Sequence, residues 1–285
     1  MNDALDSVRD HYRATGLTGR LKVALTAFGP EDQPLTPKQL AALDQFHTRG
    51  LAATAELAGL ARITADMSVL DVGSGVGGPA RFLAATYGCR VTGIDFSEPF
   101  VDAARYLTQR TGQSEQVSFH TASALELPFD NDHFDAVFLQ HVAMNITDRA
   151  RLYREIERVL KPGGRFATFD VVVANGGEPH YPVPWARTPA TSFLLTADAT
   201  REAIEQAGLR TLAWQDDTDT AKAWFAELRA SGPPPSPNLG VVMGPDFAQL
   251  TTNLGRNILE GRLGILTAVF EAASAKTAHH LENGQ

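Results

Sequence analysis

Residues 69–79 read VLDVGSGVGGP, an apolar segment that runs directly into a glycine-rich loop. The valines and the leucine at its start favour a strand that is buried on both faces. The glycines permit a tight turn and let the backbone approach a ligand closely. Pro79 suits the first turn of a helix, where a missing N–H costs nothing. The stretch therefore predicts a strand–loop–helix unit whose free N–H groups point at whatever the loop binds.

Two carboxylates help to decide what that loop binds. Gly73, Gly75 and Gly78 satisfy the G-x-G-x-x-G pattern of dinucleotide-binding proteins, so NAD is one candidate. Asp71 lies just before the glycines, where it can accept a hydrogen bond from a ligand ammonium group. Asp95 ends the next expected strand, where it can accept both hydroxyls of a ribose. A nucleoside with a zwitterionic amino-acid tail and no pyrophosphate, such as S-adenosylmethionine, matches this pair better than NAD does.

Four motifs in order resemble those of the class I S-adenosylmethionine-dependent methyltransferases. The first is the D-x-G-x-G-x-G loop at 71–77, and the second is VTGIDFS at 91–97. The third is ALELPF at 124–129, followed by FDAV at 134–137, and the fourth is RVLKPGG at 158–164. Within the family, the chain is most similar to small-molecule enzymes, the group of sarcosine/dimethylglycine and ubiquinone/menaquinone methyltransferases.

This resemblance implies a set of cofactor contacts at the ends of the first four strands. The contacts at the methionine end of the cofactor are Asp71, Gly73, Gly75 and Gly77. Those at the ribose and adenine are Asp95, Phe96 and Ser97, followed by Ser123, Ala124 and Leu125 around the adenine. Gln140, at the end of the fourth strand, completes the set. Ser123 departs from the pattern, because the family often has an acid at this position. A hydroxyl can still accept one hydrogen bond, so we expect cofactor binding to be retained.

The alternation of strand and helix patterns after residue 66 predicts an α/β fold with a parallel sheet. The resemblance implies a Rossmann-like, seven-stranded and mostly parallel sheet with an antiparallel last strand. Strands are expected over 68–72, 90–95, 116–121, 134–140, 164–173, 209–215 and about 263–270. Helices are expected around 5–12, 37–46, 48–61, 79–87, 98–111, 148–159, 200–207, 221–230 and 245–259. One integrated domain is expected, with an N-terminal helical lid (1–66), a cofactor-binding core (67–173) and a substrate cap that completes the sheet (174–285).

The end of the fourth strand carries the candidate catalytic residue. Open α/β sheets bind ligands at the carboxyl ends of their strands, beside the point where the strand order reverses. His141 lies there and is a candidate proton acceptor, because imidazole titrates near neutral pH. The alternative role for His141 is to orient backbone or cofactor by hydrogen bonding. Asn145 and His47 are candidate substrate contacts, and His47 is equally compatible with a structural role.

Residues 174–199 are rich in Pro and Gly yet contain large aromatic side chains. A loop of this length in a compact domain is usually functional or disordered, and its aromatic content argues against disorder. We interpret it as a segment that covers the substrate, with His180, Tyr181, Trp185 and Phe193 as contacts. Together with Trp214 and Trp224, its rings can hold an amine over their faces. The alternative is a satellite hydrophobic cluster beneath the loop.

The composition excludes several classes of partner. The formal net charge is −8, and no cluster of five or more basic residues occurs, which argues against a nucleic-acid substrate. The N-terminus has neither a basic segment nor an apolar core, and no apolar run approaches the ~18 residues of a membrane span. A cytoplasmic protein is therefore expected. The single cysteine rules out an internal disulfide framework, and no metal site is expected. A homodimer is compatible with the sequence, which does not decide the oligomeric state.

The expected function is S-adenosylmethionine-dependent methyl transfer to a nitrogen or oxygen of a small-molecule acceptor. Two alternatives stay open at this point. One is a cyclase or isomerase that uses the methyltransferase fold without transferring a methyl group. The other is an NAD-dependent oxidoreductase, although Asp71 and the motifs at 124–129 and 158–164 have no role in such an enzyme.

Overall fold

A twisted seven-stranded sheet forms the centre of the molecule in the computed structural model, which describes residues 16–232 and 236–273. The strand order is β3-β2-β1-β4-β5-β7-β6. The strands are β1 (Ser68–Val72), β2 (Arg90–Asp95), β3 (Val117–Thr121), β4 (Phe134–Gln140), β5 (Leu160–Val173), β6 (Leu209–Asp216) and β7 (Leu263–Ala272). Neighbouring strands are parallel, except that β7 runs antiparallel to both β5 and β6. The expected sheet and its antiparallel last strand are therefore confirmed.

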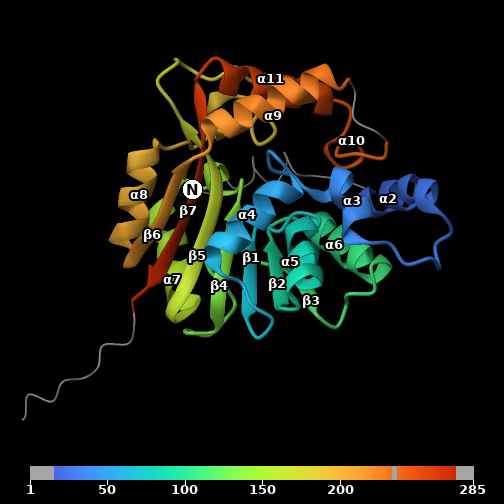
Figure 1. The fold of residues 1–285 in the computed structure, drawn as a ribbon, viewed down its shortest axis with the longest axis horizontal. Coiled ribbons are helices and arrows are strands. Elements are labelled where there is room, and N and C mark those ends of the chain that lie inside the picture. The colour runs from blue at the N-terminus through green and yellow to red at the C-terminus, as the bar shows by residue number, and fades with distance from the viewer. Residues whose placement is uncertain (1–15, 233–235, 274–285) are drawn as a thin grey trace, which may run out of the picture.

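Helices cover both faces of the sheet (Figure 1). On one face lie α4 (Leu51–Ala61), α5 (Gly78–Tyr87) and α6 (Glu98–Arg110), and on the other α7 (Arg149–Val159) and α8 (Ala197–Gln206). The central strands β1 and β4 are buried on both faces, as their continuous apolar runs predict. The order of β3, β2 and β1 is the reverse of the chain order, and β4 then follows on the other side of β1. The strand order thus reverses between β1 and β4, which brings the ends of β1, β2 and β4 together.

The N-terminal helices differ from expectation in one respect. The helix expected at 5–12 lies outside the described residues. Gly16 stands in the left-handed region (φ 70°) at the start of α2 (Leu17–Leu25), a helix that the sequence did not predict. The helix opened by Thr36 is confirmed as α3 (Pro37–Asp44), with a capping box between Thr36 and Gln39. Leucines of α2 and α3 pack against Phe100 and Leu107 of α6.

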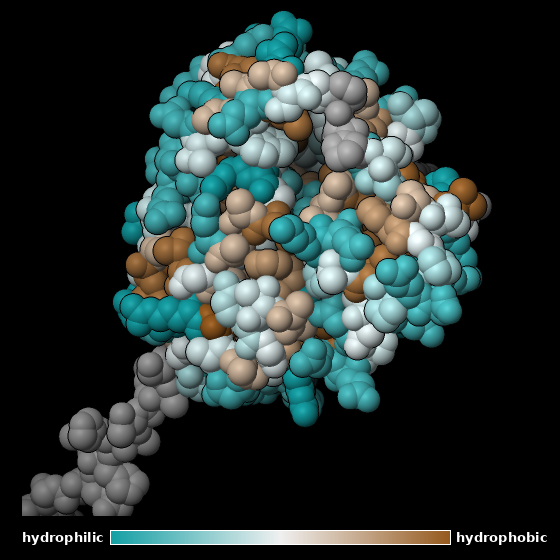
Figure 2. All heavy atoms as spheres, turned by 45° about the vertical axis from the view of Figure 1, so that its right-hand side comes forward, coloured by the Kyte–Doolittle hydropathy of each residue, from teal (hydrophilic) through white to brown (hydrophobic). Residues whose placement is uncertain are grey.

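The C-terminal part forms a cap at the end of the sheet where the parallel strands finish (Figure 1). Its helices are α9 (Thr218–Ala230), α10 (Gly240–Met243) and α11 (Phe247–Leu259). Trp185, from the long segment after β5, is 2% exposed and packs in one hydrophobic cluster with Phe225 of α9 and with Leu254 and Ile258 of α11. On the face shown in Figure 2, a hollow lies between the cap and the sheet domain. In the described part of the chain, no helix has the length and apolar character needed to cross a membrane.

Candidate functional site

The glycine loop between β1 and α5 takes a conformation that only glycine adopts easily. Gly73, Gly75 and Gly77 all have positive φ, of 72°, 54° and 81°. A Cβ at Gly73 would lie 2.4 Å from Val142 Cγ2, and one at Gly77 would lie 2.4 Å from Phe119 Cζ. Gly75 has only ordinary contacts around it and lines a cavity. Sterics and dihedral angles therefore both require the glycines at 73 and 77, while Gly75 leaves room for a ligand.

Asp71 presents a buried carboxylate beside this loop. Its side chain is 2% exposed, and Oδ2 has no hydrogen-bond partner among the described residues. Burial, together with the charge of Asp95, raises the pKa of Asp71 to about 7, and Arg81 acts in the opposite direction. A buried acceptor of this kind is costly unless something pairs with it. A ligand ammonium group would satisfy Oδ2 and keep the carboxylate ionised.

Asp95 ends β2 and ties two backbone segments together. Its Oδ2 accepts a hydrogen bond from Gly75 N at 2.9 Å, and its Oδ1 accepts one from Ser97 N at 2.8 Å. The N–H of Phe96 is a third backbone donor to this carboxylate, which leaves at least one of its four lone pairs for a ligand hydroxyl group. Ser97 stands at the N-cap of α6, although its side chain makes no capping hydrogen bond there. Asp95 thus both shapes the glycine loop and retains capacity for a ligand hydroxyl group.

A cavity of about 350 Å³ opens where β1, β2 and β4 end. The sequence-predicted residues that line it are Gly73, Gly75, Asp95, Phe96, Ser97, Ser123, Ala124, Leu125, Gln140, His141, Asn145 and Phe193. Sequence reasoning missed Phe46, Phe100 and Arg151, which also line it. Phe46 and Phe100 meet with ring centroids 5.8 Å apart. No local motif marks these three residues, because they come from α6, α7 and the end of the N-terminal helices.

A turn after β3 builds the part of the cavity where the sequence leads us to expect the adenine. Ser123 Oγ accepts a hydrogen bond from Leu125 N at 3.2 Å, so that backbone N–H is already in use. The Ser123 oxygen keeps one lone pair and its own hydroxyl proton. Ser123 can therefore serve as the polar group that replaces the family's usual acid, whereas the N–H of Leu125 is not available to a ligand.

His141 follows β4 in a strained position. It is a non-glycine residue at φ 54°, and its backbone N donates to Phe169 O at 2.8 Å. Its ring stacks on Phe169 with centroids 5.2 Å apart. Burial, and to a smaller extent His47, lower the pKa of His141 well below its ordinary value, so the imidazole is neutral at physiological pH. Its Nε2 has no hydrogen-bond partner among the described residues.

Two amides beside His141 also present unpaired oxygens. Gln140 Nε2 donates to Thr54 Oγ1 at 3.3 Å, and Asn145 Nδ2 donates to Val142 O at 3.4 Å. Gln140 Oε1 and Asn145 Oδ1 are both buried, and within the described ranges neither accepts a hydrogen bond. Both amides line the cavity, so the end of β4 presents acceptors that call for a ligand with hydrogen-bond donors, whereas Asp71 lies in β1 and does not line this cavity.

His47 lies behind His141 and does not line the cavity. Its ring nitrogens contact Thr48 O at 3.2 Å and Thr54 Oγ1 at 3.0 Å, and burial lowers the pKa of His47 to about 4. Its ring meets the edge of His141 with centroids 6.1 Å apart. The structure therefore gives His47 a supporting position and not the direct substrate contact expected from the sequence.

Most of the residues expected in the cap segment do not reach the cavity either. His180 Nε2 contacts Glu260 Oε2 at 2.8 Å, and Tyr181 and Trp185 pack in the hydrophobic cluster under α9 and α11. Trp214 lies against Arg201 instead, and Trp224 against Phe225. Among the rings expected to surround an amine, Phe193 alone lines the cavity. For Trp185 the reason is burial, because this large side chain gains more from closing the cap than from facing a wet pocket.

Comparisons with known proteins agree with this geometry. Residues 70–168 match a family model described as a methyltransferase domain. The methyltransferase GfsG of Streptomyces halstedii is 37% identical over 131 residues, which are 46% of this chain and 47% of that protein. The glycine/sarcosine/dimethylglycine N-methyltransferase of Actinopolyspora halophila is 30% identical over 160 residues, or 56% and 28% of the two chains. This chain thus spans about half or less of the length of these curated relatives.

Solved structures share the fold at low sequence identity. The [4+2]-cyclase SpnF has a TM-score of 0.65 and 23% identity, covering 85% of this chain and 98% of that one. The geranyl diphosphate C-methyltransferase of Streptomyces coelicolor A3(2), in complex with S-adenosyl-L-homocysteine, has a TM-score of 0.68 and 18% identity, covering 95% and 98%. Residues 70–168 thus match a methyltransferase domain, and together these findings support a class I S-adenosylmethionine-dependent methyltransferase.

Within the described ranges, no group of three or more His, Cys, Asp and Glu side chains is arranged to hold a metal ion.

Proposed function

We propose that this protein transfers a methyl group from S-adenosylmethionine to a nitrogen or oxygen of a small-molecule acceptor. The observation that carries the proposal is the unpaired Oδ2 of Asp71 beside a glycine loop at the strand-order reversal. That position suits the ammonium of an amino-acid tail. Asp95, with its remaining lone pairs, suits the ribose, and the turn at 123–125 suits the adenine. When bound, the cofactor supplies an electrophilic methyl group on a sulfonium.

The chemistry of the end of β4 favours a protic acceptor. Three atoms at this end lack a hydrogen-bond donor among the described residues, namely Gln140 Oε1, Asn145 Oδ1 and His141 Nε2. An N–H or O–H group on the methyl acceptor would supply such a donor. An acceptor carbon would leave these atoms unsatisfied. The site thus supports nitrogen or oxygen as the methylated atom.

His141 is the proposed proton acceptor. Its imidazole is neutral at physiological pH because burial lowers its pKa, so it is ready to take a proton. The backbone bond to Phe169 and the stacking on the Phe169 ring hold its position. Asp170 helps to fix the turn, since its Oδ2 accepts a hydrogen bond from Ala143 N at 3.1 Å.

The N-terminal residues 1–66 are proposed to act as a lid, because Phe46 lines the cavity and α3 packs on α5. We further propose a cytoplasmic protein with no nucleic-acid partner, in keeping with the net charge of −8. A homodimer is part of the same proposal, and sedimentation of the full chain tests it.

Isothermal titration of the full chain with S-adenosylmethionine, S-adenosylhomocysteine and NAD tests the cofactor. Binding of both sulfur nucleosides without NAD binding is expected, and failure of both to bind contradicts the proposal. A turnover screen with small amines, phenols, thiols and isoprenoid alkenes then tests the acceptor. Methylation of amines or phenols is expected. Methylation of the alkenes alone would show a carbon acceptor, and binding without any turnover would favour the non-methylating alternative.

A further inference from the structure

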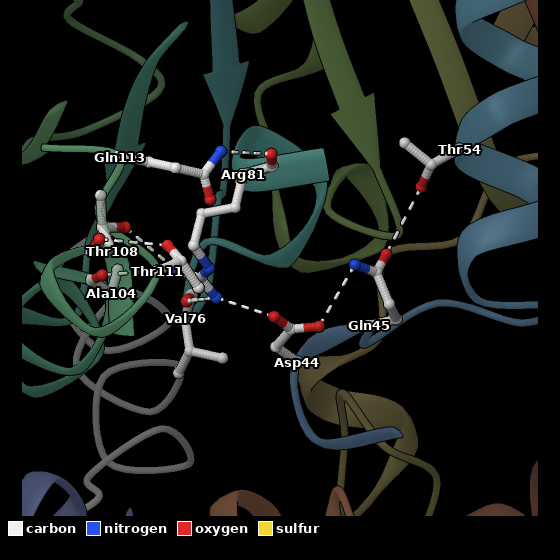
Figure 3. Close-up of polar contacts among 9 residues, drawn as sticks. All are labelled: Asp44, Gln45, Thr54, Val76, Arg81, Ala104, Thr108, Thr111 and Gln113. Atoms are coloured by element: carbon white, nitrogen blue, oxygen red, sulfur yellow. Dashed lines mark hydrogen bonds and ion pairs between the residues drawn. The ribbon is translucent and has the colours of Figure 1, made fainter. Parts of the chain in front are cut away.

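A buried ion pair lies directly behind the glycine loop. Arg81, in α5, is 0% exposed, and its Nη2 donates to Asp44 Oδ2 at 2.8 Å. Asp44 is the last residue of α3 and is itself 1% exposed (Figure 3). Removing two charges from water costs several kcal/mol per ion, so a pair of this kind is weak evidence for stability alone. Its position next to the cofactor loop points to another role.

The same guanidinium holds the loop itself. Arg81 Nη2 also donates to the carbonyl of Val76, between two of the glycines, at 2.7 Å. Arg81 Nη1 donates to Ala104 O at 3.3 Å and to Thr108 Oγ1 at 3.1 Å, both in α6. A Cβ at Gly77 would lie 2.7 Å from Nη1, so the loop packs directly on the guanidinium. Arg81 therefore joins the loop, α3 and α6 at one point (Figure 3).

From Asp44 a chain of hydrogen bonds continues to the other side of the cavity. Gln45 Nε2 donates to Asp44 Oδ1 at 3.3 Å, and Gln45 Oε1 accepts from Thr54 Oγ1 at 3.5 Å (Figure 3). Thr54 Oγ1 in turn accepts from Gln140 Nε2 at 3.3 Å. This orientation of the amide leaves Gln140 Oε1 as the atom without a partner in the described structure. The segment 44–54 also carries Phe46, which lines the cavity.

We propose that Arg81 is a positioning residue for the cofactor: it fixes the glycine loop through Val76 and, through Asp44, docks segment 44–54 against that loop. The inference rests on the proposed function, because it assigns the loop to the amino-acid end of the cofactor. It gives the Asp44–Arg81 pair and Thr54 a role in binding. One buried unit then connects the loop that holds the cofactor with the Gln140 side of the cavity.

The charge of Arg81 supports the same role. Asp71 has a pKa of about 7, and the groups that act on it are Asp95, which raises that pKa, and Arg81, which lowers it. Without the guanidinium, the Asp71 pKa would rise above about 7, and the carboxyl would be protonated at neutral pH. It would then lose its charge-assisted hydrogen bond to a ligand ammonium group. Arg81 thus acts on the loop by hydrogen bonding and on Asp71 by its field.

The test is titration of the full chain with S-adenosylhomocysteine at several pH values between about 6 and 8. Four proteins are compared: wild type, Arg81→Lys, the double variant Arg81→Met with Asp44→Leu, and the control Thr108→Val. The double variant removes both charges and so avoids an unpaired buried carboxylate. Thr108→Val removes one hydrogen bond to Arg81 on the α6 side but keeps those to Asp44 and Val76.

Wild-type affinity should rise with pH through about 7, as Asp71 ionises. In the double variant, Kd at pH 7 should weaken by about tenfold or more, and the midpoint of the pH profile should move upward. Arg81→Lys keeps the positive charge but lacks the several N–H donors of the guanidinium. Its affinity for S-adenosylhomocysteine should therefore fall, while the midpoint of the pH profile stays the same. Thr108→Val should match wild type.

Several outcomes would overturn the inference. If the folded double variant keeps the wild-type Kd and midpoint, Arg81 is only structural. If the double variant does not fold, the Arg81→Lys variant is the test, because an unchanged Kd in that variant would show that the hydrogen bonds of the guanidinium do not position the loop. If wild type itself fails to bind S-adenosylhomocysteine at any of these pH values, the proposed cofactor site falls, and this inference falls with it.

Discussion

The glycine-loop side of the molecule and the cap satisfy their polar groups in opposite ways. Beside the loop and at the end of β4, Asp71 Oδ2, Ser74 Oγ and Gln140 Oε1 are buried and have no partner in the described structure. In the cap, Asn257 Oδ1 accepts a hydrogen bond from His180 N at 2.7 Å, and Asn257 Nδ2 donates one to His180 O at 2.9 Å. Trp185 Nε1 donates to Ser192 Oγ at 2.9 Å. The first region is built to receive a ligand, whereas the second is built to close on itself.

This difference explains why the cap carries large side chains without forming a pocket from them. Trp185 and Phe225 of α9 belong to one buried hydrophobic cluster, and this burial holds residues 174–199 against the rest of the fold. Only the end of that segment reaches the cavity, where Phe193 N donates to Met144 O at 2.8 Å. A covering segment of this kind shapes the site by rigidity rather than by many contacts. The predictions below test that division between the two regions.

The largest effect is expected from Trp185→Ala. The indole is 2% exposed in the cap cluster, so its loss should lower the free energy of unfolding by about 3–5 kcal/mol. Urea denaturation of wild type and variant measures this. If stability is unchanged and only the acceptor KM rises, Trp185 is a substrate contact, and the cap is not the self-closing region described above.

His141→Ala should lower kcat by about 100-fold, because it removes the proposed proton acceptor, with the Kd for S-adenosylhomocysteine largely unchanged. In wild type, the pKa of His141 lies well below its ordinary value, so this imidazole should cause no fall in kcat between about pH 8 and 6. Steady-state kinetics on an acceptor found by the screen, together with titration calorimetry, provide both readouts. A parallel loss of kcat and cofactor affinity would make His141 a cofactor contact.

Asp71→Asn should weaken the Kd for S-adenosylhomocysteine by about tenfold and still stabilise the free protein at pH 8. The folded-state pKa of about 7 is above the ordinary 3.8, so the folded protein binds a proton more tightly than the unfolded chain does. The stability this provides is lost as pH rises from about 4 to about 7. The variant, which lacks that dependence, should have a higher free energy of unfolding than wild type at pH 8.

Urea denaturation at pH 5 and pH 8 and calorimetry check the Asp71→Asn prediction. Asp170, with a pKa of about 6, contributes a pH dependence of the same sign, so the difference between variant and wild type is the quantity to compare. A variant that binds as wild type does would remove Asp71 from the cofactor site.

The smallest effect is expected from His180→Ala. The contact with Glu260 is partly exposed, and such pairs contribute about 1 kcal/mol or less. Neither the cofactor Kd nor the acceptor KM should change. A rise of tenfold in the acceptor KM would show that residues 174–199 contact the substrate through His180, as the sequence analysis expected.

Local pattern predicted the cofactor half of this protein well. The strands at 68–72, 90–95 and 134–140 have the expected bounds, and Gly73, Gly75 and Asp95 line one cavity. These features follow from short-range rules, namely apolar runs, positive φ at glycine and the placement of acids at strand ends. The start of β5 at Leu160 rather than at 164 was missed, because it depends on pairing with Phe134 across the sheet.

The amino-acid sequence by itself thus determined the sheet, the glycine loop and the class of cofactor. Tertiary structure alone decided that Trp185 belongs to the core, that His47 stands behind His141 and that Arg81 joins Asp44 to the loop. Arg81 and Asp44 are 37 residues apart, and nothing in either local sequence marks them as partners. Short-range patterns set the backbone, but which buried polar groups meet depends on how distant elements pack. That packing is also what leaves Asp71 Oδ2 and Gln140 Oε1 without a hydrogen-bond partner among the described residues.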